Sequence, residues 1–196
     1  LIDQMAVRFS DRVLTGTGAY RQYLIDEFYA APDKVQVVPL GVDDSLFFPE
    51  SHNLVTQNKI VIMYHGSYIP NHGVDTIIEC AALLKDDNRF IFRLVGDGEQ
   101  KEGIEALSNK MKIDSIEFLA KVPFVQLYKY IARANIVLGV FGNTSQANKA
   151  MANKILEGLA MKKTVVSGDT TSIRENFIHG QDLWLVPLSD ARALSE

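Results

Sequence analysis

Short apolar runs alternate with amphipathic stretches along most of this chain. The apolar runs, which we predict to be strands, are 59–65, 90–95, 116–120, 136–141, 164–168 and 183–188. Apolar residues at helical spacing predict helices over 73–84, 99–112, 124–134 and 153–162, and a short one around 172–178. Strands that are apolar throughout are buried on both faces, and their alternation with helices implies parallel pairing. The sequence therefore predicts an α/β fold with a Rossmann-like parallel sheet flanked by helices.

Residues 1–48 follow a different pattern. They predict a helix followed by a short strand up to residue 17, a second helix over 19–30, and a strand from residue 35 that runs into a turn-rich connector. One or two βα elements are too few for a sheet of their own. Residues 49–58 are polar and contain Pro49, so we predict a linker there and a main domain over 59–196.

Composition places the chain among globular proteins. Of its 196 residues, 47% are hydrophobic and 22% are charged, which excludes a disordered chain, a collagen and a coiled coil. A net charge of −4 leaves no global basic field for nucleic acid. The single cysteine, Cys80, suits a reducing compartment. No apolar run approaches the ~18 residues that span a bilayer. The chain opens at Leu1 in mid-pattern, and we expect it to be a fragment.

The segments that follow the predicted strands are where we expect a ligand. In parallel α/β sheets, ligands bind at the carboxyl ends of the strands, near the point where the strand order reverses. The segments concerned are 66–73, 96–98, 120–123, 141–154 and 168–172.

The motif at 95–98, Val-Gly-Asp-Gly, follows a strand and precedes a helix. A dinucleotide-binding G-x-G-x-x-G would need a third glycine at Lys101, so the motif is more typical of a tight turn. The chain has no phosphate-binding G-x-x-x-x-G-K-[ST], no G-x-S-x-G, and no histidine spacing that shares a metal. We therefore predict no metal site.

Two loops and one carboxylate remain as candidates. The loop 66–73 is polar and bounded by glycines, which suits either phosphate binding at a helix N-terminus or a plain βα connection. The loop 141–154 exceeds the usual length of about 2–6 residues for a βα loop. Glu157 stands in an otherwise apolar helix, either on a solvated face or as an acceptor for ribose hydroxyls, with Lys154 one turn earlier facing phosphate.

Six segments in order carry a family resemblance. The most specific are VQVVPLGVDDSLFFP at 35–49, HGSYIPNHGVDTIIECAALL at 65–84, and NKILEGLAMKKTVVSGDTTSIRENFIHGQDLWLVP at 153–187. Together they resemble the C-terminal nucleotide-sugar-binding domain of the retaining glycosyltransferases of family 4, also called group 1, which have a two-lobed GT-B fold. Residues 1–48 would then be a remnant of the N-terminal lobe with the interdomain crossover, and the chain would be truncated at Glu196.

The resemblance implies an enzyme that transfers a sugar from a nucleotide-diphosphate donor, UDP- or GDP-linked, with retention and without metal or other cofactor. The acceptor, a glycan or a lipid-linked sugar, would bind mainly to the missing lobe, so the isolated chain would be inactive. The full-length protein would be cytoplasmic, with peripheral association at the inner face of the cytoplasmic membrane, and would bind no nucleic acid.

The resemblance also implies site residues. Glu157 matches the second glutamate of an E-x7-E motif that holds the donor ribose, whereas the first glutamate is replaced by Lys149. Ser67 and His72 stand where relatives carry arginine and lysine; Ser67 cannot neutralise a diphosphate, and His72 would be partly charged near about pH 6.5. Lys154, or Lys149 as a second candidate, would supply the missing cation. The other implied donor-binding residues are Gly66, Lys121, Val122, Gly142, Asn143 and Leu156.

Two other functions stay open from the residues. A non-catalytic nucleotide-sugar-binding domain would explain the missing arginine, lysine and first glutamate. A nucleotide-sugar epimerase of the same architecture would need an acid and a base, which the sequence does not reveal.

Overall fold

The computed structural model describes residues 2–49 and 59–196. The N-terminal elements are α1 (Ile2–Phe9), β1 (Val13–Thr15), α2 (Gly18–Phe28) and β2 (Val35–Val37). The remaining strands are β3 (Ile60–Ser67), β4 (Phe90–Asp97), β5 (Ile116–Leu119), β6 (Ile136–Leu138), β7 (Thr164–Gly168) and β8 (Trp184–Val186). The remaining helices are η1 (Pro70–His72), α3 (Val74–Leu83), α4 (Lys101–Met111), α5 (Phe124–Ala132), α6 (Ser145–Lys149), α7 (Asn153–Ala160), α8 (Thr171–Arg174) and α9 (Ala191–Ser195). The predicted linker, apart from Pro49, lies outside the described residues.

The main sheet has six strands in the order β5-β4-β3-β6-β7-β8, and every pairing is parallel. The predicted α/β fold with a parallel sheet is therefore confirmed. The strand order reverses between β3 and β6, so this is the point where a ligand is expected at the carboxyl ends of the strands.

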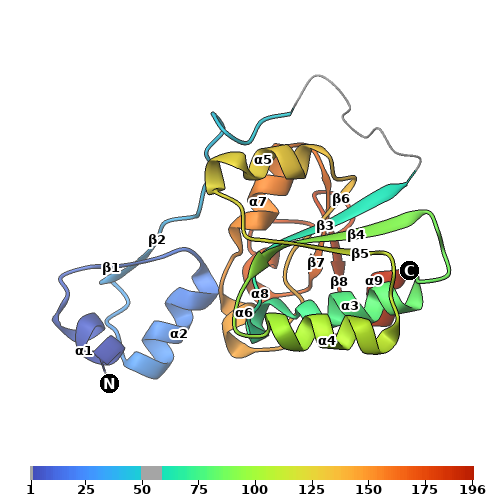
Figure 1. Cartoon of the computed structure of the whole chain (residues 1–196). Helices are drawn as coiled ribbons and strands as arrows, with labels where there is room; N and C mark the ends of the chain where they lie inside the picture. Colours follow the sequence, from blue (N-terminus) through green and yellow to red (C-terminus); the bar gives the residue numbers. More distant parts are fainter. Residues whose placement is uncertain (1, 50–58) are drawn as a thin grey trace.

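Helices cover both faces of this sheet (Figure 1). Helices α3, α4 and α9 pack on one face, with Ile77, Ile78 and Phe92 in the core there. Helices α5 and α7 pack on the other face, around Met63, Ile131 and Ile155. Because each strand faces apolar neighbours on both sides, its sequence is apolar throughout, as the pattern indicated.

Two short α-helices fall outside the prediction, as does the 3-10 helix η1. Helix α6 lies within the long loop 141–154, where Thr144 caps it by accepting a hydrogen bond from the backbone N–H of Ala147. Helix α9 ends the chain and is capped in the same way by Asp190. Both are five-residue helices, too short to show helical periodicity, and their capping residues were the available signal.

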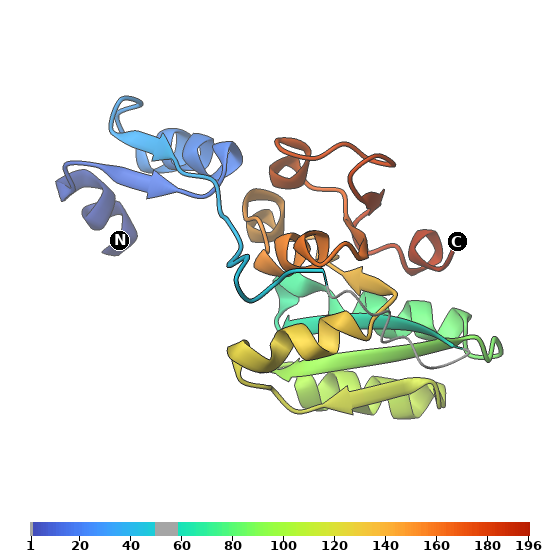
Figure 2. The same ribbon diagram turned by 90° about the horizontal axis from the view of Figure 1, so that it is seen from above.

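The N-terminal residues form a small unit beside the main sheet (Figure 2). Strands β1 and β2 pair in parallel, so the expectation that this segment is too short for a sheet was wrong. Helix α2 connects the two strands, and Val7, Leu24 and Val35 form an apolar cluster with Ala30. The unit also contacts α6 and α8 of the main domain, which adds support that two strands alone would lack.

Within residues 2–49 and 59–196, every helix is too short or too polar to cross a membrane.

Candidate functional site

The carboxyl ends of β3 and β4 lie in close register. Gly66 pairs with Gly96, and a Cβ at Gly96 would lie 1.9 Å from the carbonyl oxygen of Gly66. A Cβ at Gly98 would similarly meet the backbone of Tyr68 at 2.6 Å. The glycines of the 95–98 motif thus allow two backbones to approach, which agrees with the tight-turn interpretation.

The two candidate loops meet at the point where the strand order reverses. The backbone N–H of Phe141 donates to the carbonyl of His72 at 3.0 Å. The hydroxyl of Thr144 donates to the side-chain oxygen of Asn71 at 2.8 Å. Segments that are about 70 residues apart in the sequence therefore form one structural unit beside β3 and β6.

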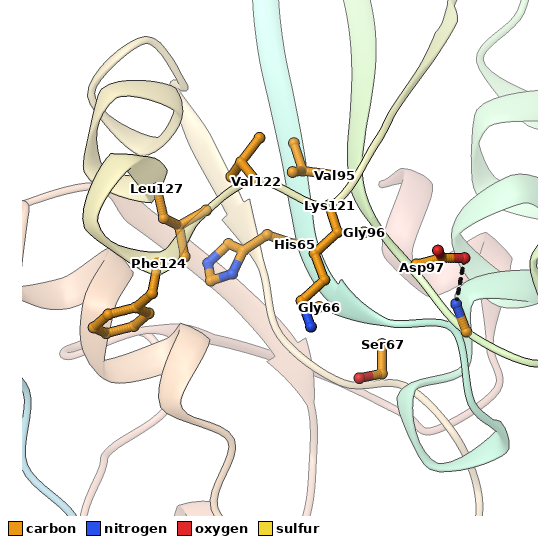
Figure 3. Close-up of a pocket in the computed structure, with 11 residues that line it drawn as sticks. His65, Gly66, Ser67, Val95, Gly96, Asp97, Lys121, Val122, Phe124 and Leu127 are labelled. Carbon is orange, nitrogen blue, oxygen red and sulfur yellow. Dashed lines mark hydrogen bonds between the residues drawn. The ribbon is translucent and has the colours of Figure 1, made fainter.

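A cavity of about 630 Å³ opens beside the start of the loop 66–73 (Figure 3). It is lined by the ends of β3 and β4 and by the segment that joins β5 to α5. Four predicted site residues line it: Gly66, Ser67, Lys121 and Val122. The lining also includes His65, Val95, Gly96, Asp97, Gly98, Phe124 and Leu127, which were not among the predicted site residues.

Lys154 is buried in the first turn of α7, with 5% of its surface exposed. Its Nζ lies 4.3 Å from the centroid of the Tyr64 ring and 3.3 Å from Nδ1 of His72. A Cβ at Gly66 would lie 2.8 Å from this Nζ, so glycine leaves room for the ammonium directly behind the cavity wall. Burial lowers the pKa of Lys154 to about 7, although the charge of Glu157 opposes the shift.

No carboxylate oxygen in the described part of the chain lies within 4.0 Å of the Lys154 ammonium. A buried cation without a close counter-charge is costly. The buried ammonium therefore makes Lys154 a candidate functional residue.

Glu157 is also buried, with 5% of its surface exposed, so the solvated-face interpretation was wrong. Its Oε2 lies 3.4 Å from Nε2 of His65, a residue that lines the cavity. Burial raises the pKa of Glu157 to about 7, and the charge of Lys154 limits the rise. The carboxylate and the ammonium therefore influence each other's charge, although they form no close ion pair.

His72 contacts the same group. Its Nδ1 lies 2.8 Å from the hydroxyl of Tyr64 and 2.6 Å from the carbonyl oxygen of Ser67. Burial and the neighbouring charge of Lys154 lower the pKa of His72 to about 4. The expectation of partial charge near pH 6.5 was therefore wrong, because the side chain is half-buried and lies beside the charge of Lys154.

Lys149 lies elsewhere. Its Nζ is 3.4 Å from the centroid of the Tyr23 ring and donates to the hydroxyl of Ser145 at 2.9 Å. The structure thus does not bring Lys149 together with Lys154. Of the other predicted residues, Asn143 is exposed, Leu156 is half-buried, and Gly142 is packed against the carbonyl of Pro70.

Metal ligands do not gather in the described ranges: residues 2–49 and 59–196 hold no group of three or more His, Cys, Asp or Glu side chains that fits an ion.

Curated proteins of known name resemble this chain over most of its length. It is 25% identical over 186 residues to the D-inositol 3-phosphate glycosyltransferase of Acidothermus cellulolyticus, a match that covers 86% of this chain and 41% of the relative. It is 26% identical over 190 residues to the probable sucrose-phosphate synthase of Thermosipho melanesiensis, covering 91% of this chain and 44% of the relative. The chain therefore spans less than half the length of these relatives.

Solved structures share the fold. The Anabaena protein HepE in complex with UDP-glucose matches with a TM-score of 0.84 at 20% identity, covering 97% of this chain and 54% of that chain. Sucrose-phosphate synthase from Thermosynechococcus elongatus also gives a TM-score of 0.84, at 19% identity, covering 99% of this chain and 49% of that chain. The parallel sheet and its flanking helices thus match one lobe of GT-B glycosyltransferases.

The family described as glycosyl transferases group 1 matches residues 59–196 of this chain. That range holds the whole six-stranded sheet and the buried Lys154 and Glu157. This protein belongs to the group 1 glycosyl transferases.

Proposed function

We propose that this chain is the donor-binding lobe of an enzyme that transfers a sugar from a nucleotide-diphosphate sugar to an acceptor. The observation that carries the proposal is the buried ammonium of Lys154, which has no carboxylate oxygen within 4.0 Å among the described residues. A donor diphosphate would supply the missing counter-charge. The UDP-glucose complex of the structurally similar HepE supports a uridine nucleotide as the first donor to test.

The proposed arrangement follows the cavity. The base would lie beside Lys121 and Val122, which line the cavity. Glu157, which neighbours the lining residue His65, would accept hydrogen bonds from the ribose hydroxyls. The diphosphate would lie between Gly66 and the start of the loop 141–154, where Gly142 and Asn143 offer backbone N–H groups. Lys154 would lie behind it, close to Gly66.

The chemical task is to stabilise the leaving group. Negative charge develops on the nucleoside diphosphate as the bond to the sugar breaks, and a preorganised cation in a dry site stabilises that charge most. The resemblance supports a reaction that retains the anomeric configuration and uses no metal, and we include both in the proposal.

The acceptor would bind mainly outside this chain. In a two-lobed enzyme the cleft lies between the lobes, and this chain spans 41% of the length of the Acidothermus relative. We therefore expect the chain alone to bind donor weakly and not to transfer sugar. A glycan or a lipid-linked sugar as acceptor, and action at the inner face of the cytoplasmic membrane, rest on the family resemblance.

Nucleotide binding tests the proposal directly. We expect millimolar UDP or GDP to raise the melting temperature of the 196-residue chain, and Lys154→Met to remove most of the shift. Lys149→Met is the matched control, because its ammonium lies over Tyr23 and its variant should keep the shift. The proposal fails if no nucleoside diphosphate changes the melting temperature.

A second candidate is a donor-binding lobe without turnover. Ser67 and Lys149 stand where the family carries an arginine and a glutamate, and Lys149 faces the N-terminal unit. Assay of the full-length protein with labelled nucleotide sugars separates the two candidates: a glycoside product supports the enzyme, whereas binding without product supports the second candidate.

A further inference from the structure

His65 is a buried polar residue that has no role in the proposed donor site. It lies in β3, directly before Gly66, and only 5% of its surface is exposed. It nevertheless lines the cavity, and Figure 3 shows its ring on the cavity wall between Gly66 and Leu127. Its position is therefore internal to the protein and adjacent to the expected ligand.

The Nε2 atom of His65 has no hydrogen-bond partner among the described residues. Buried polar atoms are nearly always paired, so an orphaned nitrogen needs an explanation. The carboxylate of Glu157 is close by, with its Oε2 at 3.4 Å from this nitrogen. This separation is longer than a good hydrogen bond between such groups, so the two side chains are neighbours without a hydrogen bond between them.

The position of the proton limits which protonation states the His65–Glu157 pair can have. Burial lowers the pKa of His65 to about 3, so its imidazole is neutral and carries one proton. If Nε2 were the bare nitrogen, its lone pair would face an ionised carboxylate and repel it. A proton must therefore lie between the two groups, either on Nε2 or on the Glu157 carboxyl.

We propose that His65 is a positioning residue for Glu157. In its Nε2–H tautomer, His65 donates a hydrogen bond to one carboxylate oxygen of Glu157. The remaining lone pairs of the carboxylate then accept hydrogen bonds from both ribose hydroxyls of a ribonucleoside diphosphate. This inference rests on the proposed function. A ribose hydroxyl donates its hydrogen, so the carboxylate must be ionised and correctly turned when the donor binds. A neutral imidazole donor achieves both without adding a competing positive charge.

The other charged or titratable groups around the pair are the same in the wild type and in each His65 variant, including Lys154, whose pKa of about 7 lies within the tested pH range. Lys154 lies on the same helix as Glu157, and His72 follows β3 in the adjacent loop. The hydroxyl of Tyr64 reaches the His72 ring from β3. A change at His65 alone therefore changes the donor to Glu157 and leaves these neighbours in place.

The experiment compares UDP with 2′-deoxy-UDP and 3′-deoxy-UDP by calorimetry on the 196-residue chain, from about pH 6 to about pH 9. We expect the wild type to prefer UDP by about tenfold or more, because each deoxy analogue leaves a carboxylate lone pair unpaired. His65→Leu should reduce this preference to about threefold or less, and should move the pH midpoint of the preference upward, because loss of a donor favours the protonated carboxyl. His65→Gln keeps a side-chain N–H and should restore both.

Cys80→Ala is the control for a general loss of packing, because Cys80 is buried but does not line the cavity. Its UDP preference and pH midpoint should equal those of the wild type. If His65→Leu does not fold, His65→Asn replaces it, because the shorter amide cannot reach Glu157 but keeps a polar group.

The outcomes separate the two proposals. A wild type that binds no nucleoside diphosphate overturns the proposed function. A wild type that binds UDP while every His65 variant keeps its preference and midpoint overturns the positioning role and leaves the function intact. Equal affinity of the wild type for UDP and its deoxy analogues also overturns it, since Glu157 would then not hold the ribose.

Discussion

The ammonium of Lys149 lies 3.4 Å from the centroid of the Tyr23 ring, so this lysine joins the N-terminal unit to the main domain. The carbonyl of Lys149 also accepts a hydrogen bond from the Thr17 hydroxyl at 2.5 Å. Lys149, which the sequence offered as a second candidate for the diphosphate cation, thus packs between two parts of the chain. The cation lies against an aromatic face, an interaction that contributes about 0.5–2 kcal/mol.

The carboxylate of Glu175 makes a second link between the same parts. It accepts from the backbone N–H groups of Gly18 at 2.7 Å and Ala19 at 2.5 Å, in the first turn of α2. Glu175→Ala should destabilise α2 by about 1 kcal/mol, the usual value of a cap with a favourable helix-dipole contact. Hydrogen exchange should then accelerate over 18–28 and stay unchanged over 74–83. Glu79→Ala, at an exposed site on α3, is the control, and equal exchange in both variants would contradict the link.

Gly142 is required by packing between the two loops. A Cβ there would lie 2.1 Å from the carbonyl oxygen of Pro70, a backbone atom that cannot move aside. Gly142→Ala should lower the free energy of unfolding by about 2 kcal/mol or more. Gly103→Ala is the matched control, because a Cβ there meets no atom within 4 Å and helical alanine gains about 0.5–1 kcal/mol over glycine. Urea unfolding of both variants measures the difference, and a neutral Gly142→Ala would disprove the contact.

We expect the buried charge of Lys154 to lower the free energy of unfolding, although the same charge favours binding of the donor. The pKa of Lys154 is lowered to about 7 in the folded chain from 10.5, so the folded state loses a proton that the unfolded state keeps between these values. The destabilisation is therefore full below about pH 7 and disappears as the pH rises toward 10.5. Lys154→Met should raise the free energy of unfolding by about 2 kcal/mol at or below pH 7, with a smaller gain at alkaline pH.

The control for this change is Lys110→Met, on the exposed last turn of α4. It should leave the free energy of unfolding nearly unchanged at each pH. A gain for Lys154→Met that does not shrink as the solution becomes alkaline would show that the lysine charge is not its cause.

Cys80 should react with thiol reagents only when the chain unfolds. Its thiol is buried in α3, and burial raises its pKa to about 12, so little thiolate forms at neutral pH. Labelling by a thiol reagent should follow the rate of unfolding and accelerate in urea. Rapid labelling of the folded chain would contradict the packing of α3 on the sheet.

Two features of the sequence predicted most of the main domain. The apolar runs over 90–95 and 164–168 became strands of a parallel sheet because burial on both faces requires continuous apolar side chains. The loops after the strands then meet at one edge, since the carboxyl ends of parallel strands point the same way. The pattern failed at α6, whose five residues are too few to show a period.

The state of each candidate side chain depended on contacts that a sequence pattern does not contain. Spacing placed Lys154 and Glu157 one turn apart, but their burial came from the packing of α7 against β6 and β7. Local pattern also could not tell that Lys149 faces Tyr23, because 126 positions separate the two residues. The sequence by itself determined the α/β fold, the family and the sheet edge where a ligand is expected, because periodicity and motif order are local. Only the tertiary structure decided which cation is buried without a counter-charge, since desolvation and pairing arise from neighbours distant in sequence.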